Sequence, residues 1–129
     1  MAPIDRLLSS RPLRRFAILL ALALTACSDA PSAPSPAATI SIGPAGVDRQ
    51  EVRIKAWDFV TFVNNDNRPH AIVSDPVDAH SQCPQINRVG VLQPGERRET
   101  GTLELKKSCG FHDHNDPSDR SLQGRIVVE

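Results

Sequence analysis

The sequence predicts an all-β fold, a Greek-key β-sandwich of about seven or eight strands, and three observations support this expectation. Residues 38–129 contain short segments in which apolar and polar side chains alternate, as in strands that bury one face. Turn-forming pairs such as Gly43-Pro44 and Pro94-Gly95 separate these segments. No stretch of this region keeps the apolar spacing of an amphipathic helix. Short strands at this spacing are typical of a sandwich.

The expected strands can be placed in order along the chain. Residues 39–42 and 51–55 alternate regularly, so each predicts a strand with one buried face. Residues 59–63 are richer in aromatic and β-branched side chains, which favours a more buried strand. An asparagine-rich turn at 64–67 ends it. The remaining expected strands are residues 70–73, 89–92, 100–105 and 124–128.

The first 26 residues are typical of an export signal. Their basic side chains are Arg6, Arg11, Arg14 and Arg15. Residues 16–24 form an uncharged apolar run that is too short for a permanent membrane span. The following Leu24-Thr25-Ala26-Cys27 resembles the bacterial lipobox, which implies that Cys27 receives a lipid. An ordinary secretory signal with an incidental cysteine, or an uncleaved signal anchor, are the alternatives.

The sequence as a whole predicts three segments. Residues 1–26 form a lipoprotein signal peptide that is removed, and residues 27–37, rich in proline, alanine and serine, form a flexible tether. Residues 38–129 form one domain, because the mature chain is long enough for only one modest core. Ser28 stands where an aspartate signals inner-membrane retention in many Gram-negative lipoproteins. We therefore expect a lipid-anchored, periplasm-facing protein, on the outer membrane if the source is Gram-negative.

The charge balance argues against nucleic-acid binding. The chain has 15 basic and 15 acidic side chains, and the leader contains four of the arginines and one aspartate. The mature part therefore has 11 basic and 14 acidic groups, a net charge of about −3, and no basic stripe. Two cysteines, Cys83 and Cys109, remain after Cys27. In an oxidising compartment they can form a disulfide or supply a metal ligand.

All histidines, and both cysteines of the predicted domain, lie between positions 70 and 114. They are His70, His80, Cys83, Cys109, His112 and His114. Such clustering of imidazoles and thiols favours a metal site. The most specific part is Cys109-x-x-His112, combined with His70 after the asparagine-rich turn.

At these residues the domain resembles the cupredoxin superfamily, the plastocyanin- and azurin-like blue copper domains. The resemblance covers residues 38–129 and rests on three motifs: residues 60–70 with their terminal His70, residues 92–96 with the Pro-Gly turn, and residues 109–128. It implies one copper ion with His70, Cys109 and His112 as ligands. A thiolate and two imidazoles lie between the geometries that the two copper oxidation states prefer, which suits electron transfer.

The sequence departs from the family pattern in two places. Met1 is the only methionine, so no axial methionine is available, and Leu122 occupies the expected position. The loop from His112 to Leu122 is also longer than usual. The axial position is either empty or filled by another group, for which His114 is the nearest candidate, followed by Asp113 or Asp116. A nitrogen or oxygen ligand there would favour Cu(II).

Several alternatives stay open at this level. Cys83 can pair with Cys109 and remove the thiolate, or it can act with His80 as an additional ligand. The favoured function is single-electron transfer to redox partner proteins by a copper-binding lipoprotein that has no turnover of its own. The first alternative is a copper carrier, chaperone or sensor with copper-exchange partners. The second is a structural or interaction sandwich with a Cys83–Cys109 disulfide and no metal, and a copper oxidoreductase with an open site is a minor third.

Overall fold

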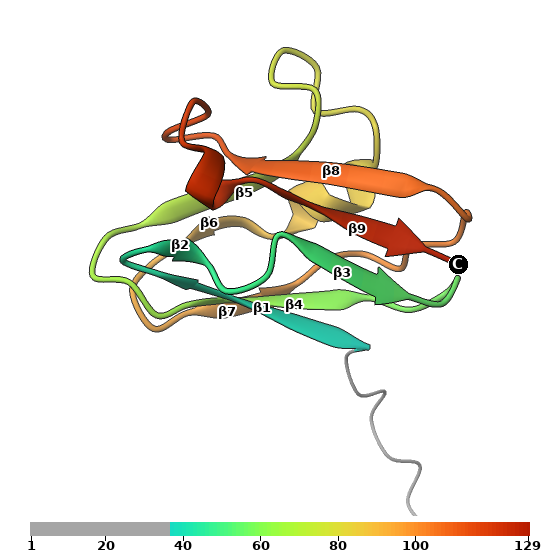
Figure 1. Cartoon of the computed structure of the whole chain (residues 1–129), viewed down its shortest axis with the longest axis horizontal. Coiled ribbons are helices and arrows are strands. Elements are labelled where there is room, and N and C mark those ends of the chain that lie inside the picture. The colour runs from blue at the N-terminus through green and yellow to red at the C-terminus, as the bar shows by residue number, and fades with distance from the viewer. Residues whose placement is uncertain (1–36) are drawn as a thin grey trace, which may run out of the picture. The chain divides into compact units, whose positions relative to one another are not determined.

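The computed structural model describes residues 37–129 as two facing β-sheets (Figure 1). One sheet contains, in spatial order, β2 (Gly46–Val47), β1 (Ala38–Gly43), β4 (Val60–Asn64) and β7 (Arg97–Glu99). The other contains β3 (Glu51–Ile54), β9 (Gly124–Val128), β8 (Ser108–Asp113), β5 (His70–Ser74) and β6 (Gly90–Leu92). Two short 3₁₀ helices, η1 (Pro84–Arg88) and η2 (Arg120–Leu122), complete the described part.

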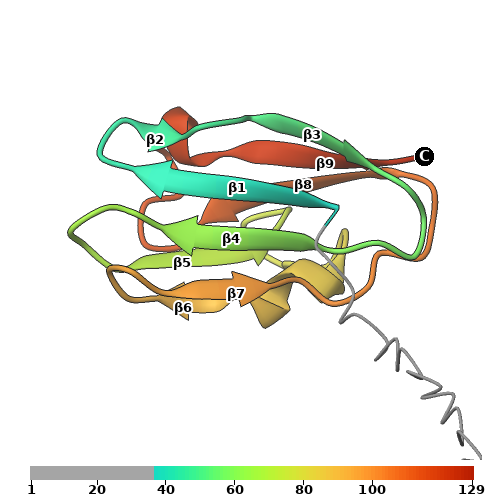
Figure 2. The same cartoon turned by 90° about the horizontal axis from the view of Figure 1, so that it is seen from below.

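The strand order joins segments that are distant in the sequence. β1 pairs in parallel with β4, and β3 pairs in parallel with β9, whereas β8 is antiparallel to both β5 and β9 (Figure 2). The parallel pairs require crossovers between the two sheets. These pairings place the last third of the chain in the middle of the five-stranded sheet, so β8 has a partner on each side.

The core lies between the sheets and follows from the alternation along each strand. Ile40 and Ile42 of β1 and Phe62 of the neighbouring β4 share this core with Phe111 of β8, and the two phenylalanine rings pack edge to face with centroids 5.0 Å apart. Such aromatic contacts add to the free energy gained by burying apolar area. Leu122, at the position expected for an axial methionine, is 1% exposed and belongs to this core. The all-β sandwich prediction is confirmed.

Two segments differ from the expected elements. Residues 100–105 form no strand, and only Leu103 makes an isolated bridge, to Asp58. The nearby strand is instead β7, which is fully exposed and charged and pairs with β4. The segment from Ser108 to Asp113, which contains the Cys109-x-x-His112 motif and is absent from the expected strands, is the central strand β8. This second difference decides the nature of the site.

The predicted leader 1–26 and, apart from Ala37, the tether 27–37 lie outside the described residues. Within residues 37–129, no helix has the length and apolar character needed to cross a membrane.

Candidate metal centre

His112 is buried on β8, and only one of its two ring nitrogens has a hydrogen-bond partner among the described residues. Its Nδ1 lies 2.7 Å from Oδ1 of Asp75, and the side chain is 1% exposed. Its Nε2 is buried and has no hydrogen-bond partner within residues 37–129. A buried polar atom without a partner costs free energy. The Asp75 carboxylate, which accepts from Nδ1, leaves Nε2 as a lone-pair donor for a cation.

His80 lies in the connection between β5 and η1, with its backbone in the left-handed region at φ 48°. Its N–H donates to the carbonyl of Pro76 at 2.8 Å, and its own carbonyl accepts from Asn87 Nδ2 at 2.8 Å. These bonds hold a backbone conformation that is uncommon for residues other than glycine. The Nε2 of His80 is also buried and lacks a partner among the described residues. The His80 ring lies near His112, with ring centroids 5.4 Å apart.

His114 completes a cluster of three imidazoles. It follows β8 directly, is exposed, and its ring centroid lies 4.9 Å from that of His80. One ligand nitrogen from each of His80, His112 and His114 lies within 4.8 Å of the other two. Two nitrogens bound to one first-row metal ion at about 2.0–2.1 Å, at angles between about 90° and 120°, are roughly 2.8–3.6 Å apart, so the three rings would have to move inward by about 1–2 Å to close the set. We call this group the three-histidine cluster.

Asp75 reaches His112 because residue 110 of β8 has no side chain. A Cβ built on Gly110 would lie 2.1 Å from Oδ2 of Asp75, which leaves no room for both. The backbone also links the two segments, because the Asp75 N–H donates to the carbonyl of Gly110 at 3.0 Å and the Gly110 N–H donates to Oε1 of Gln82 at 2.7 Å. Gly110 therefore allows the connection after β5 to lie directly on β8.

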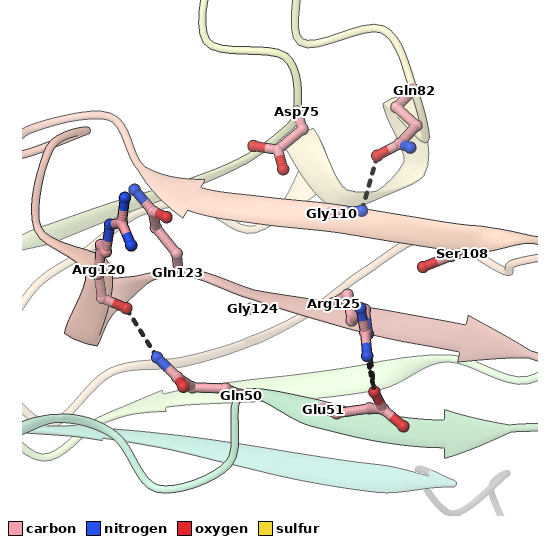
Figure 3. Close-up of a pocket in the computed structure, with 10 residues that line it drawn as sticks. All are labelled: Gln50, Glu51, Asp75, Gln82, Ser108, Gly110, Arg120, Gln123, Gly124 and Arg125. Atoms are coloured by element: carbon pink, nitrogen blue, oxygen red, sulfur yellow. Dashed lines mark hydrogen bonds and ion pairs between the residues drawn. The ribbon is translucent and has the colours of Figure 1, made fainter.

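A polar groove of about 580 Å³ adjoins the cluster on the outer face of β8 and β9 (Figure 3). Asp75 forms part of its wall, and Arg125 is paired there with Glu51. The lining residues are Gln50, Glu51, Asp75, Gln82, Ser108, Gly110, Arg120, Gln123, Gly124 and Arg125. The carboxylate that orients His112 is thus reachable from this side.

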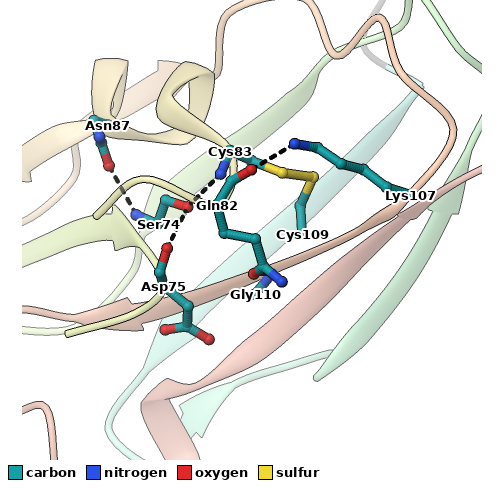
Figure 4. Close-up of a disulfide and its surroundings, with 8 residues drawn as sticks. All are labelled: Ser74, Asp75, Gln82, Cys83, Asn87, Lys107, Cys109 and Gly110. Carbon is teal, nitrogen blue, oxygen red and sulfur yellow. Dashed lines mark hydrogen bonds between the residues drawn. A yellow bond between two sulfur atoms is a disulfide. The ribbon is translucent and has the colours of Figure 1, made fainter. Parts of the chain in front are cut away.

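A disulfide joins Cys83 to Cys109 and connects the segment that contains His80 to the strand that contains His112 (Figure 4). Both cysteines are fully buried in the core. Around the bond, the Cys83 N–H donates to Ser74 Oγ at 2.8 Å, and Lys107 Nζ donates to the carbonyl of Gln82. Each cysteine is three residues from a histidine of the cluster, so the cross-link fixes both sides of the site.

The structure corrects the expectation that Cys109 supplies a copper ligand. Its sulfur is bonded to Cys83 and offers no thiolate, which is the alternative that the sequence left open. The strand geometry is a second reason. Side chains alternate along β8, so Cys109 and Phe111 face the core while His112 faces the outer side of the sheet. A C-x-x-H motif inside a strand therefore cannot bring both side chains to one ion.

The structure also shows that His70 is not positioned as the copper ligand that the sequence predicted. Its ring is 1% exposed and lies between two carboxylates, with Nδ1 at 2.7 Å from Asp113 Oδ2 and Nε2 at 3.0 Å from Asp66 Oδ2. Both ring nitrogens have partners, so neither is free for a metal ion. His70, Cys109 and His112 are thus not brought together, whereas His114 and His80, the secondary candidates, join His112. Cys83 is no ligand either, because it forms the disulfide.

Asp66 and Asp113 are part of this buried cluster. No sequence pattern indicated Asp66, and Asp113 was expected only as a candidate axial ligand. The other oxygen of Asp113 accepts the N–H groups of Ala71 and Asn115, each at 2.9 Å. The hydrogen bond from the Asn67 N–H, with those from His70 and Arg68, lowers the pKa of Asp66. Asp66 lies within the asparagine-rich turn and Asp113 ends β8, so only the folded arrangement identifies these two as buried partners of His70.

The lowered pKa of Asp66 predicts a defined pH dependence of stability. A folded-state pKa below the ordinary 3.8 stabilises the fold at pH values above 3.8, and this stabilisation is lost as the pH falls through the folded-state value. We expect Asp66→Asn to be less stable than the unmodified protein at pH 6 and the difference to shrink below pH 3.8. Urea unfolding at pH 6 and at a pH below 3.8 measures the difference in unfolding free energy between the two proteins. A difference that does not change with pH would contradict the assignment, and Asp78→Asn, at an exposed position, is the control.

A second prediction concerns Asp75, which resembles the carboxylates that orient metal-bound histidines. Loss of such an outer partner typically lowers metal affinity by about 10- to 100-fold. We therefore expect Asp75→Ala to weaken Cu(II) binding by that factor and to destabilise the metal-free protein by about 1–3 kcal/mol, because the buried Nδ1 of His112 loses its partner. Competition titration with a chelator measures the affinity. Asp78→Ala, on the same connection, is the matched control, and equal affinities in both variants would contradict the orienting role.

The comparisons with known proteins agree with this architecture. No protein-family model and no curated protein sequence matches the chain. Among solved structures, a purple cupredoxin from Nitrosopumilus maritimus is 22% identical, covers 71% of this chain and 99% of its own, and has a TM-score of 0.58. Amicyanin from Paracoccus versutus is 20% identical over 76% of this chain and 86% of its own, with a TM-score of 0.57.

These likenesses, all at low sequence identity, establish the fold. The chain has the cupredoxin fold, as the resemblance of its motifs predicted. The three-histidine cluster lies on the outer face of the five-stranded sheet. His70, the first copper ligand expected from the sequence, lies elsewhere and is hydrogen-bonded to Asp66 and Asp113.

Proposed function

We propose that this chain is a lipid-anchored copper-binding protein of the bacterial envelope that holds one copper ion through the three-histidine cluster and exchanges it with partner proteins. The observation that supports this most directly is the pair of buried, partnerless Nε2 atoms of His80 and His112. Such atoms fit a cation that accepts their lone pairs. Among divalent first-row ions, imidazole sites bind Cu(II) most tightly.

Copper carriage suits this donor set better than a closed electron-transfer site. The cluster has no thiolate, because Cys109 is in the disulfide, and a nitrogen-only set favours Cu(II). His114 is exposed, so one side of the cluster is open to an incoming ligand from another protein. The residues of the chain would bind, orient and release the ion.

Spectroscopy of the protein purified from the bacterial envelope tests the proposal. We expect one equivalent of Cu(II) to bind with an electron paramagnetic resonance spectrum typical of nitrogen ligands and with no intense thiolate-to-copper charge-transfer band. An intense band would place Cys109 on the metal and contradict the disulfide-bonded site. No binding at all would leave a structural or interaction sandwich without metal.

Single-electron transfer is the second candidate function, and the fold comparisons favour it. Amicyanin variants with this fold are described in oxidised, reduced and Cu(I) forms. A bound copper ion would supply a one-electron couple. Cleanly reversible voltammetry together with retention of copper during dialysis against a chelator would favour electron transfer, whereas rapid loss to the chelator would favour carriage.

Anchoring through Cys27 is the part of the proposal that depends on the sequence alone. Leu24-Thr25-Ala26-Cys27 fits the lipobox, and Ser28 favours the outer membrane in a Gram-negative cell. Mass spectrometry of the protein extracted from membranes should find a diacylglyceryl group on Cys27 as the first residue. Cys27→Ala should move the protein to the soluble fraction, and an unchanged membrane fraction would contradict lipid anchoring.

A further inference from the structure

Two large apolar side chains are exposed in neighbouring loops of the sandwich. Trp57, in the connection between β3 and β4, is 69% exposed, and Leu105, in the connection that precedes β8, is 68% exposed. The two loops are hydrogen-bonded to each other, because the Trp57 N–H donates to the carbonyl of Leu103 at 2.8 Å. Exposure of two such side chains has a free-energy cost in water, which a surface that receives them would remove.

The backbone at Trp57 is in a conformation that bulky residues rarely adopt. Its φ is 75°, in the left-handed region, and the adjoining turn is closed by bonds between Lys55 and Asp58. Residues with such backbone angles persist only where the surrounding structure holds them, and they are often found at functional sites. The turn therefore presents the indole away from the core at some conformational cost.

These loops lie at the end of the sandwich where the tether joins the domain. The Ala37 N–H donates to the carbonyl of Phe59, two residues after Trp57, and β1 begins next to β4 at this end. The C-terminus is here as well, since the Ala56 N–H donates to the carbonyl of Glu129. Figures 1 and 2 both show the β3–β4 connection, the loop before β8 and the C-terminus at one end.

We propose that this end, through Trp57 and Leu105, rests on the surface of the lipid bilayer to which Cys27 is attached. The inference depends on the proposed lipid anchor but not on the copper site. Tryptophan is enriched at membrane–water interfaces because its ring is apolar and its N–H is polar. Only nine residues lie between Cys27 and Ala37, so the tether spans at most about 36 Å and keeps this end near the bilayer.

The tether makes a weak surface contact sufficient. Two side chains alone give little affinity for a bilayer, but a short link raises the effective concentration to roughly the millimolar range. Charge does not drive the contact, because the two loops and the C-terminus carry both signs. Their charged groups are Lys55, Asp58, Glu104, Lys106, Lys107 and Glu129. The contact is therefore apolar, and we expect little dependence on salt.

This orientation turns the three-histidine cluster away from the membrane. β8 starts next to Lys107 at the membrane end and leads to His112 and His114 near its other end. The six residues of β8 between Lys107 and His114 span about 20 Å. The membrane contact would thus leave the copper site open to partner proteins in the periplasm.

The native fluorescence tests the proposal, because Trp57 is the only tryptophan of the chain. The lipidated full-chain product, purified from membranes, is reconstituted in vesicles of phosphatidylethanolamine and phosphatidylglycerol. We expect a blue-shifted emission relative to the Cys27→Ala protein in solution, a several-fold lower quenching by aqueous iodide, and strong quenching by lipids brominated near the headgroup. Trp57 as accessible to iodide on vesicles as in solution would overturn the inference.

Two variants separate membrane contact from other causes. Leu105→Glu keeps the tryptophan but places a charge in the contact, so it should restore iodide quenching to the value in solution. Val91→Glu, at a position that is 49% exposed on β6, is the matched control and should behave as the unmodified protein. A blue shift that grows with protein density on the vesicles would indicate contact between copies and would overturn the inference.

Mass spectrometry of the same sample separates this inference from the anchor on which it depends. A Cys27 without lipid would contradict the anchor and the membrane contact together. A lipid-modified Cys27 combined with a fully accessible Trp57 would overturn the membrane contact alone.

Discussion

Removal of the disulfide is expected to have the largest effect on stability. The double variant Cys83→Ala/Cys109→Ala should lose about 3.5 kcal/mol of unfolding free energy, because the bond closes a loop with a sequence separation of 26 residues. Urea unfolding of the metal-free protein measures this loss. Gln82→Ala, which removes one hydrogen bond to β8 and keeps the disulfide, should cost only about 1 kcal/mol.

The same double variant should also bind copper less tightly. The disulfide holds the connection that contains His80 against the strand that contains His112, so without it this connection must be ordered when the ion binds. Ordering a segment of this kind costs about 1.4 kcal/mol, which corresponds to a tenfold loss of affinity. An unchanged affinity would show that the remaining hydrogen bonds position His80 on their own.

A comparison of two histidine variants distinguishes the two possible metal sites. We expect His80→Ala to weaken Cu(II) binding by more than about 100-fold, which exceeds the usual cost of losing an outer partner. His70→Gln should leave copper affinity nearly unchanged but destabilise the fold by about 1–3 kcal/mol, because one of its two buried carboxylates loses a hydrogen bond. Chelator competition and urea unfolding of both variants supply the two measurements. The opposite pattern, with copper affinity lost only in His70→Gln, would restore the site expected from the sequence.

The sandwich could be predicted from the sequence because alternation is a local property. Strands such as 39–42 and 124–128 show it directly, and both are present with boundaries close to those expected. The strand at Ser108–Asp113 could not be assigned in the same way. It contains a glycine, a histidine and an aspartate, and its strand character comes from pairing with β5 and β9, which a single sequence does not reveal.

The candidate site was predictable in composition but not in arrangement. The clustering of four histidines and two cysteines indicated a metal site, and the three-histidine cluster uses three of these residues. The spacing of Cys109 and His112 is the same in a loop and in a strand, and only in the strand do the two side chains face opposite ways. Asp75 had no signal at all, because its role depends on the bare backbone of Gly110.

His112 and the disulfide-bonded Cys109 lie on opposite faces of β8, which separates metal binding from maintenance of the fold. The cross-link and the apolar side chains maintain the sandwich without an ion, while a bound ion would relieve only the two buried Nε2 atoms of His80 and His112. The empty protein should therefore be a lasting, folded species rather than a transient one. A protein that stays folded without copper can bind and release the ion repeatedly, and its cellular abundance need not follow the supply of metal.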